Sequence, residues 1–110
     1  MVLGDINIDM VLFISNYPRE GDEVLANSFD IRLGGSGCNT AIVLSKLGAS
    51  VSLRGCVGQD ILGQMALKEL VSADIDTSLV IQDKFNITGF MAIVVGKRGQ
   101  RTMFGFRGAN

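Results

Sequence analysis

Residues 33–48 read LGGSGCNTAIVLSKLG, and this stretch decides the fold. Glycines at positions 34, 35 and 37 allow a tight turn and a close approach of backbone to a neighbouring group. Apolar residues then recur at helical spacing over 39–47, and Gly48 stands where a glycine commonly follows a helix. The preceding residues, 24–33, alternate loosely between apolar and polar side chains, as a half-exposed strand does. The stretch therefore predicts a strand, a glycine turn and a helix in succession.

Outward from this stretch, strands and helices alternate. A strand is expected at 50–57 and a second helix at 61–72, with Asp60 as its N-cap. Strand–helix–strand units of this kind imply an α/β fold with a parallel sheet. The strand at 24–33 and a late hairpin do not fit a simple alternation, so we expect a small separate sheet beside the α/β core. The remaining strands are expected at 6–14, 79–81, 88–95 and 101–106, with a hairpin loop at 96–100.

Composition excludes several classes of function. The chain has 110 residues, with 10 lysines and arginines against 11 acids, which leaves a net charge of −1 and no basic surface for nucleic acid. No apolar run approaches the ~20 residues that cross a membrane, and no positively charged leader is present. The absence of histidine excludes Ser-His-Asp and Cys-His catalysis. Cys38 and Cys56 are too few for a disulfide framework or a zinc site, so we expect reduced, buried thiols in a cytoplasmic protein of one domain.

The glycine turn at 34–37 has two interpretations. Free backbone N–H groups at the start of the following helix attract an anion or a polar oxygen, so the turn is a candidate binding site. The alternative is a tight turn that binds nothing. A dinucleotide fingerprint is excluded because Thr40 stands where its third glycine or alanine is needed, and a Walker A loop is excluded because no Gly-Lys-Ser/Thr follows.

Asn7 and Asp9 interrupt an otherwise apolar strand. At positions i and i+2 their side chains face the same side of the strand, and burying an amide and a carboxylate without partners is costly. They therefore either bond neighbouring backbone groups or line a polar pocket suited to vicinal hydroxyls. Asn39 likewise either caps the helix or directs its amide into the same pocket.

A basic segment follows late in the chain. Lys97, Arg98 and Arg101 lie in and beside the expected hairpin loop, and Arg107 follows further on. A solvated hairpin tip explains them, and the functional alternative is a mobile cover that reaches a phosphate.

Six short pieces of the sequence carry a resemblance to a known family. They are GDINID at 4–9, GGSGCNTA at 34–41, LGA at 47–49, VGQD at 57–60 with Gly63, TG at 88–89 and GAN at 108–110. The ordered set resembles the ribokinase-like (pfkB) family of carbohydrate and nucleoside kinases, and Asn-x-Asp at 7–9 is most similar to its ribokinase branch. The resemblance implies a Rossmann-like core near 1–14 and 35–76, with lid strands near 22–34 and 79–107, as the N-terminal part of one domain.

The resemblance also implies a reaction, which is transfer of the γ-phosphoryl group of ATP, with Mg²⁺, to a hydroxyl of a sugar or nucleoside. In several members of this family the lids of two subunits pair, so the resemblance implies a homodimer. The family's catalytic aspartate and ATP site lie in a half expected beyond Asn110, so residues 1–110 are expected to hold no catalytic residue and to be inactive alone. The substrate-binding residues implied here are Asn7, Asp9, Gly34, Gly35, Ser36 and Asn39, with Arg107 in the lid.

Two departures from the family pattern affect the choice of substrate. Ser36 stands where ribokinases usually carry lysine, and Cys38 stands where they carry alanine. Other pentoses, hexoses and nucleosides are therefore candidate substrates in addition to ribose. The alternative to a kinase portion is a non-catalytic module that binds sugar or dimerises through its lid strands, since exposed strand edges invite pairing.

Overall fold

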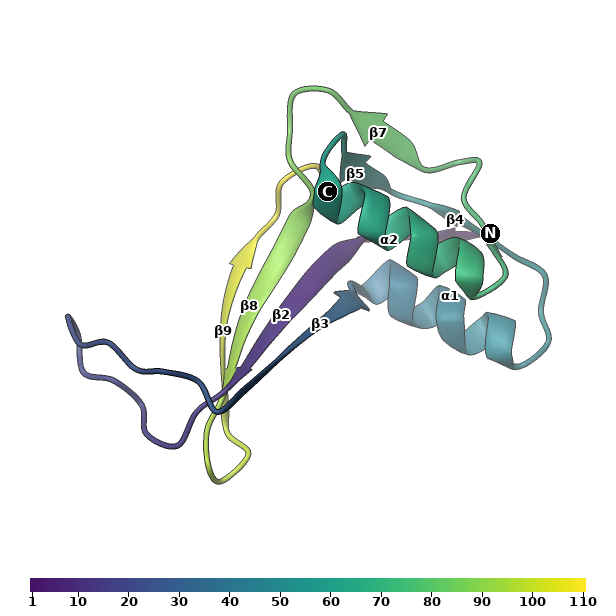
Figure 1. The fold of residues 1–110 in the computed structure, drawn as a ribbon. Coiled ribbons are helices and arrows are strands. Elements are labelled where there is room, and N and C mark those ends of the chain that lie inside the picture. The colour runs from purple at the N-terminus through teal and green to yellow at the C-terminus, as the bar shows by residue number, and fades with distance from the viewer.

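A small parallel sheet forms the base of the molecule in the computed structural model, which describes residues 1–110. Its strands β1 (Val2–Leu3), β4 (Val51–Arg54) and β6 (Ile75–Asp76) pair in the order β1-β4-β6, all parallel. The helices α1 (Ser36–Lys46) and α2 (Ile61–Ser72) lie in the connections and pack against this sheet (Figure 1). The predicted α/β fold with a parallel sheet is therefore confirmed.

The two helices begin in different ways. At α2, Asp60 is the N-cap and its carboxylate accepts a hydrogen bond from the Gly63 N–H at 2.8 Å, as predicted. At α1 the N-cap is Gly35, with φ 96°, and no side chain caps the helix. The helix begins three residues earlier than the predicted residue 39, and the interpretation of Asn39 as a cap is wrong because Gly35 holds that position.

The longest strands form a four-stranded sheet that extends away from the helices as a curved arm (Figure 1). β2 pairs antiparallel with β3 and parallel with β8, and β8 pairs antiparallel with β9. The strand predicted at 6–14 therefore belongs to this sheet and not to the parallel base. The strand predicted from residue 24 begins only at Ser28. The bounds are β2 (Asn7–Phe13), β3 (Ser28–Gly34), β8 (Gly89–Val95) and β9 (Arg101–Phe106).

The expected single strand at 50–57 is divided at Gly55. β4 stays with β1 and β6, whereas β5 (Cys56–Gly58) pairs in parallel with β7 (Ile81–Asp83) in a separate two-stranded sheet. A Cβ at Gly55 would meet the Gly4 carbonyl oxygen at 2.7 Å and the Ile6 side chain at 2.8 Å, so close packing requires glycine where the chain changes sheets. The strand predicted at 79–81 correspondingly lies two residues later.

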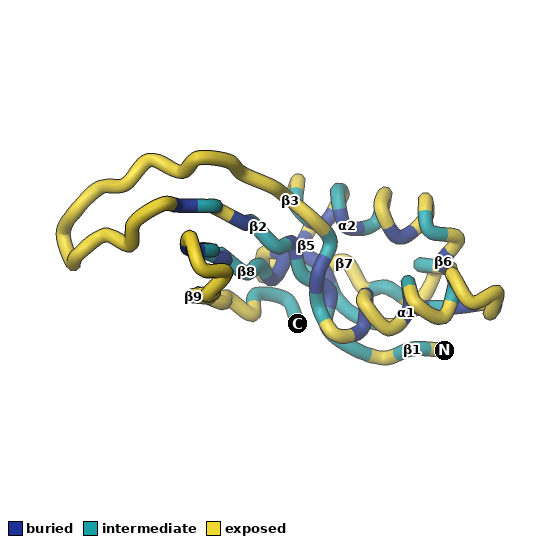
Figure 2. The backbone as a smooth tube through the Cα atoms, turned by 90° about the horizontal axis from the view of Figure 1, so that it is seen from below, coloured by how far each residue is buried: buried dark blue, intermediate teal, exposed yellow.

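The hydrophobic core lies where the helices meet the strands. Ile6 and Ile8 lead from the base into the arm and are buried, whereas residues 15–30 are exposed throughout (Figure 2). Cys38 is fully buried in this core, and burial raises the pKa of its thiol to about 12, so it stays protonated. Both cysteines are unpaired, but Cys56 is only partly buried, so the expectation of a buried thiol is wrong for Cys56. The core cluster also contains Ala41, Val51, Leu53, Val57, Ala66, Leu70 and Ile75.

Asp60 also ties α2 to the arm. Its second carboxylate oxygen accepts the Thr88 N–H at 2.8 Å, and the Thr88 hydroxyl both donates to Asp60 at 2.8 Å and accepts the Gly58 N–H at 2.9 Å. Thr88 is completely buried at the start of β8. Burial alone would raise the pKa of Asp60, but these hydrogen bonds outweigh it and lower the pKa below its ordinary value of 3.8.

Asp60→Ala is expected to lower the free energy of unfolding by about 3 kcal/mol. It removes an N-cap worth ~1 kcal/mol and leaves buried donors of Thr88 unpaired, each at a cost of ~1–3 kcal/mol. Urea unfolding measures this change. Asp76→Ala is the matched control, because Asp76 accepts a hydrogen bond from the Ser78 N–H on an exposed turn and its removal should change stability far less. An equal loss in both variants would contradict the role assigned to Asp60.

The lowered pKa of Asp60 also sets a direction for the pH dependence of stability. Between the folded pKa and 3.8 the unfolded chain binds more protons than the folded one. The contribution of Asp60 is therefore present above pH 3.8 and is lost as the pH falls through the folded pKa.

No helix of the structure is long and apolar enough to cross a membrane.

Candidate functional site

One face of β2 carries the polar side chains that the sequence singled out. Asn7 and Asp9 are two residues apart in the strand, so they point to the same face as predicted. The register places Gly34 of β3 and Gly89 of β8 on either side of Asn7. Asn7 therefore stands between two strand positions that carry no side chain, whereas Asp9 is paired with Arg32 and Met91.

Asp9 is half-buried and makes no hydrogen bond within the protein. Every buried side-chain nitrogen or oxygen has a hydrogen-bond partner, so the unpaired carboxylate oxygens of Asp9 reach the accessible surface. Burial raises the pKa of this carboxyl above its ordinary value, and the positive charge of Arg32 partly offsets the effect. Gly34 lies so close that a Cβ there would collide with the carboxylate. The carboxylate of Asp9 is thus a hydrogen-bond acceptor that no donor of the protein reaches, and it lies directly against Gly34.

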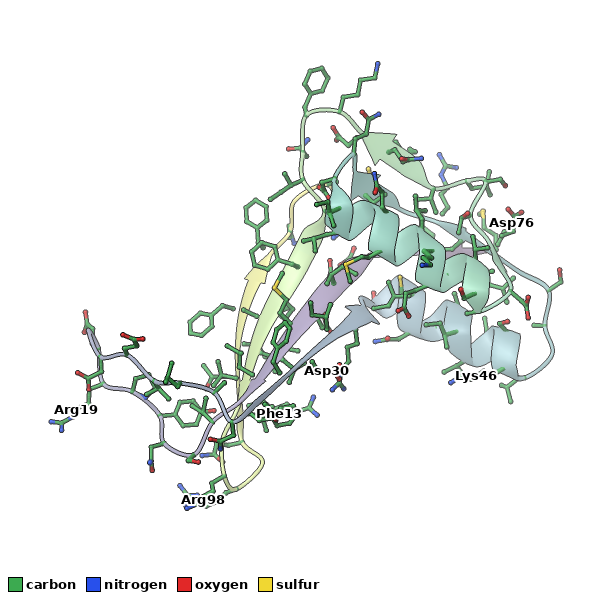
Figure 3. The ribbon with its side chains drawn as sticks, in the orientation of Figure 1. Phe13, Arg19, Asp30, Lys46, Asp76 and Arg98 are labelled. Atoms are coloured by element: carbon green, nitrogen blue, oxygen red, sulfur yellow. The ribbon has the colours of Figure 1, made fainter.

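A cavity of about 220 Å³ lies at Asp9. Arg32 and Arg101 line it together with apolar side chains of β2 and β8. The guanidinium of Arg32 donates to Asp30 at 2.8 Å, so Asp9 has no direct ion pair. Asp30 lies on β3, the strand at one edge of the arm (Figure 3).

A second cavity, of about 310 Å³, lies at Asn7. Asp5, Arg107 and Asn110 contribute its polar lining. The Asn7 Oδ1 accepts a hydrogen bond from the Asn110 Nδ2 at 2.6 Å. Arg107, predicted as a lid residue, thus lines the cavity of Asn7.

The glycine turn at 34–37 serves packing as well as the site. Gly35 has φ 96°, and a Cβ there would collide with the Asp5 carbonyl oxygen. A Cβ at Gly37 would meet the Gly4 backbone at 2.7–2.9 Å. Close backbone contact therefore accounts for Gly35 and Gly37, whereas Gly34 is required by the carboxylate of Asp9.

Ser36 and Asn39 lie at the start of α1, where both are exposed. Neither makes a side-chain hydrogen bond or lines either cavity. The structure thus brings Asn7, Asp9 and Gly34 together on one face and leaves these two residues on the helix beside it.

Sequence reasoning missed three polar residues of the two cavities. Asp5 and Asn110 belong to the family motifs GDINID and GAN, but these motifs alone did not predict that the two residues line the Asn7 cavity. Arg32 had no signal, because its position depends on the pairing of β3 with β2. The basic loop behaves as a solvated hairpin tip, since Lys97 and Arg98 are exposed and Arg98 lies at the tip of the loop (Figure 3).

Comparison with known proteins identifies the family. The chain matches the pfkB family carbohydrate kinases over residues 1–110. It belongs to this family. The pfkB chain is 30% identical to the ribokinase of Haemophilus influenzae over 109 residues, which are 99% of the chain and 36% of that protein. It is 29% identical, over the same shares, to the deoxyribokinase of Salmonella typhi.

The fold of the pfkB chain agrees with that of solved relatives. The structure of Arabidopsis thaliana ribokinase complexed with ribose and ATP superposes with a TM-score of 0.88 at 26% identity, covering 99% of this chain and 36% of that one. The predicted pfkB family and the ribokinase-like α/β fold are confirmed. The pfkB chain spans about a third of the length of these relatives.

Residues 1–110 do not form a metal site built from several protein ligands. No group of three or more aspartate, glutamate, cysteine or histidine side chains comes close enough to hold a metal ion.

Proposed function

We propose that this chain is the acceptor-binding and lid portion of an ATP-dependent sugar or nucleoside kinase. The observation that carries the proposal is Asp9, a half-buried carboxylate with no partner in the protein, pressed against Gly34 at the edge of a cavity. A group of this kind is costly to bury unless a ligand supplies donors. Hydroxyls of a sugar are such donors, and the ribose-bound relative supports this class of ligand.

The chain's own residues would position the acceptor and exclude water. The carboxylate of Asp9 accepts hydrogen bonds from hydroxyls, which fixes the acceptor relative to the phosphoryl donor. We assign the lid to the four-stranded sheet of β2, β3, β8 and β9, which excludes water when it lies over the acceptor. We assign the core to β1, β4, β6 and the two helices. Residues 1–110 correspond to about a third of the length of the kinase relatives, so we assign the ATP site and the catalytic base to the part of the enzyme outside these residues.

An assay of phosphoryl transfer tests the proposal. The complete gene product, with ATP and Mg²⁺, is expected to phosphorylate at least one of ribose, 2-deoxyribose, fructose and adenosine. Residues 1–110 alone are expected to phosphorylate none of them. Turnover by residues 1–110 alone, or no turnover of any acceptor by the complete product, would overturn the assignment. We also place the enzyme in the cytoplasm, where its unpaired thiols stay reduced.

A second function, pairing with another copy of the chain, is favoured by the opposite face of the lid. The register puts Ile31 and Phe104 in one row of this face, and Phe29 and Phe106 in the neighbouring rows. All four are exposed, Phe104 at 63%. A contiguous apolar patch of this kind marks an interaction site, and a second lid is a complementary apolar occupant.

Phe104→Glu is expected to convert the dimer into a monomer, because the charge would be buried without a partner. Light scattering over a range of concentrations measures the mass. The matched control is Phe85→Glu, since Phe85 is 93% exposed in the segment between β7 and β8. If Phe104→Glu stays dimeric, or both variants dissociate equally, the assigned surface is wrong.

A further inference from the structure

The side chain of Asn110 lies at the base of the Asn7 cavity and makes four hydrogen bonds. Its Oδ1 accepts the Ile6 N–H at 2.9 Å. Its Nδ2 donates to the Ile6 carbonyl oxygen at 3.3 Å, the Arg107 carbonyl oxygen at 3.1 Å and the Asn7 Oδ1 at 2.6 Å. Asn110 is therefore the one side chain that joins the start of β2 to the segment after β9.

The backbone fixes which way the amide of Asn110 faces. A backbone N–H is only a donor, so the atom of Asn110 that meets the Ile6 N–H must be its oxygen. The amide nitrogen then faces the Ile6 and Arg107 carbonyls, which are only acceptors, and it also faces Asn7. If the amide of Asn110 were turned by 180°, its nitrogen would face the Ile6 N–H, which is also a donor. Its oxygen would then face the Ile6 and Arg107 carbonyl oxygens, which are also acceptors.

The orientation of Asn110 in turn fixes that of Asn7. Since Asn110 presents a donor, Asn7 turns its Oδ1 toward it, which leaves the Asn7 Nδ2 without a partner in the protein. Asn7 is half-buried, and no buried polar atom lacks a partner, so this Nδ2 reaches the accessible surface of the cavity. A Cβ at Gly89 would lie 2.5 Å from the Asn7 Oδ1 and would also collide with the Asn110 Nδ2. Glycine at this position therefore leaves the space that the paired side chains occupy.

We propose that Asn110 is a positioning residue that makes Asn7 a hydrogen-bond donor toward the acceptor substrate. The inference rests on the proposed function. One face of β2 then presents a hydrogen-bond donor, the Asn7 Nδ2, and a hydrogen-bond acceptor, the Asp9 carboxylate. The complementary ligand is a polyol whose oxygen at Asn7 offers a lone pair while a hydroxyl at Asp9 offers its proton. Asn110 also lines this cavity, but both ends of its amide are already bonded within the protein, so we infer that it acts through Asn7.

A double-mutant cycle in the complete gene product tests this role. The dissociation constant is measured by calorimetry for the tightest-binding member of a panel of ribose, 2-deoxyribose, fructose and adenosine. Asn110→Ala is expected to weaken binding about 10-fold, the size of one lost hydrogen bond. In an Asn7→Ala background the same change is expected to have no effect on binding, because no amide is left to orient.

The outcomes separate this inference from the proposed function. An equal loss from Asn110→Ala in both backgrounds means a structural role only, which overturns the inference and leaves the proposed function standing. If Asn7→Ala and Asp9→Ala both bind as the unmodified protein does, or no member of the panel binds, the proposed function fails and the inference with it. Thermal unfolding of each variant gives its stability separately.

Nitrogen-15 NMR of the Asn7 side-chain amide in the unmodified protein keeps the test valid if the alanine variant does not fold, and Asn110→Asp supplies a comparison. The carboxylate still accepts the Ile6 N–H but now presents an acceptor to Asn7, whose amide is expected to turn and direct its Oδ1 into the cavity. Nitrogen-15 NMR of the Asn7 side-chain amide reports the difference. Ligand is expected to shift this signal in the unmodified protein and to leave it nearly unchanged in Asn110→Asp. A ligand that weakens on Asn7→Ala yet leaves the Asn7 amide signal unmoved in the unmodified protein would overturn the inference.

Discussion

Replacing Asp9 by asparagine is expected to lower kcat/KM for the sugar acceptor about 100- to 1000-fold, because hydrogen bonds to a charged group contribute roughly 1.5–3 kcal/mol each. Arg32 beside the carboxylate bonds Asp30, and the carboxylate itself has no partner in the protein, so its hydrogen bonds in the complex are those to the ligand. Steady-state kinetics of the complete gene product measure the change. Asp22→Asn is the control, because Asp22 lies in the exposed loop between β2 and β3 and lines neither cavity. An Asp9→Asn enzyme with unchanged kcat/KM would contradict the assignment.

The same substitution has an opposite effect on stability. The pKa of Asp9 is raised by burial, so the folded chain holds a proton more readily than the unfolded chain does. Ionisation of Asp9 therefore costs stability above its folded pKa, and Asp9→Asn is expected to keep or raise the melting temperature at pH 7.

The pH profile of activity is also expected to change. In the unmodified enzyme kcat/KM should fall at acid pH, as the pH drops through the raised pKa of Asp9. This fall is expected to disappear in Asp9→Asn.

Gly34→Ala is expected to be the second large effect. Its new Cβ would collide with the carboxylate of Asp9, and such overpacking costs about 1–3 kcal/mol of stability. Displacement of Asp9 from the cavity is also expected to weaken acceptor binding roughly 10- to 100-fold, one or two lost hydrogen bonds to a charge. Chemical denaturation and calorimetric titration of the variant measure the two effects.

The Asp9→Ala background is the matched control for Gly34→Ala. The colliding atoms belong to the carboxylate, so Gly34→Ala should destabilise this background far less than it destabilises the unmodified protein. An equal loss of stability in both backgrounds would mean that Gly34 is required for another reason, such as its place at the end of β3.

Local patterns in the sequence predicted the elements that local interactions determine. The helix at 61–72 and its cap Asp60 are found as predicted, because an aspartate N-cap before an apolar helical pattern needs no distant partner. The strand at 101–106 and the loop at 96–100 also agree, since a hairpin is defined by neighbouring residues. The face shared by Asn7 and Asp9 follows from strand geometry alone.

Features that depend on tertiary contacts could not be predicted in this way. Apolar and polar residues alternate at 51–54, and Gly55 follows within the predicted strand. This pattern does not show that the chain changes sheets at Gly55, which depends on the packing of that glycine against Gly4 and Ile6. Periodicity shows that residues 6–14 contain a strand but not which sheet it joins. Asn110 lies 103 positions from Asn7 in the chain, so the bond between their side chains had no signal in local spacing.

The most direct test of the central claim is a crystal structure of the complete gene product with its bound acceptor. We expect a hydroxyl of the acceptor within hydrogen-bond distance of the Asp9 carboxylate, beside Gly34, with the four-stranded sheet covering the ligand. An acceptor bound elsewhere, with Asp9 still facing solvent, would contradict the claim that this face of β2 binds the substrate.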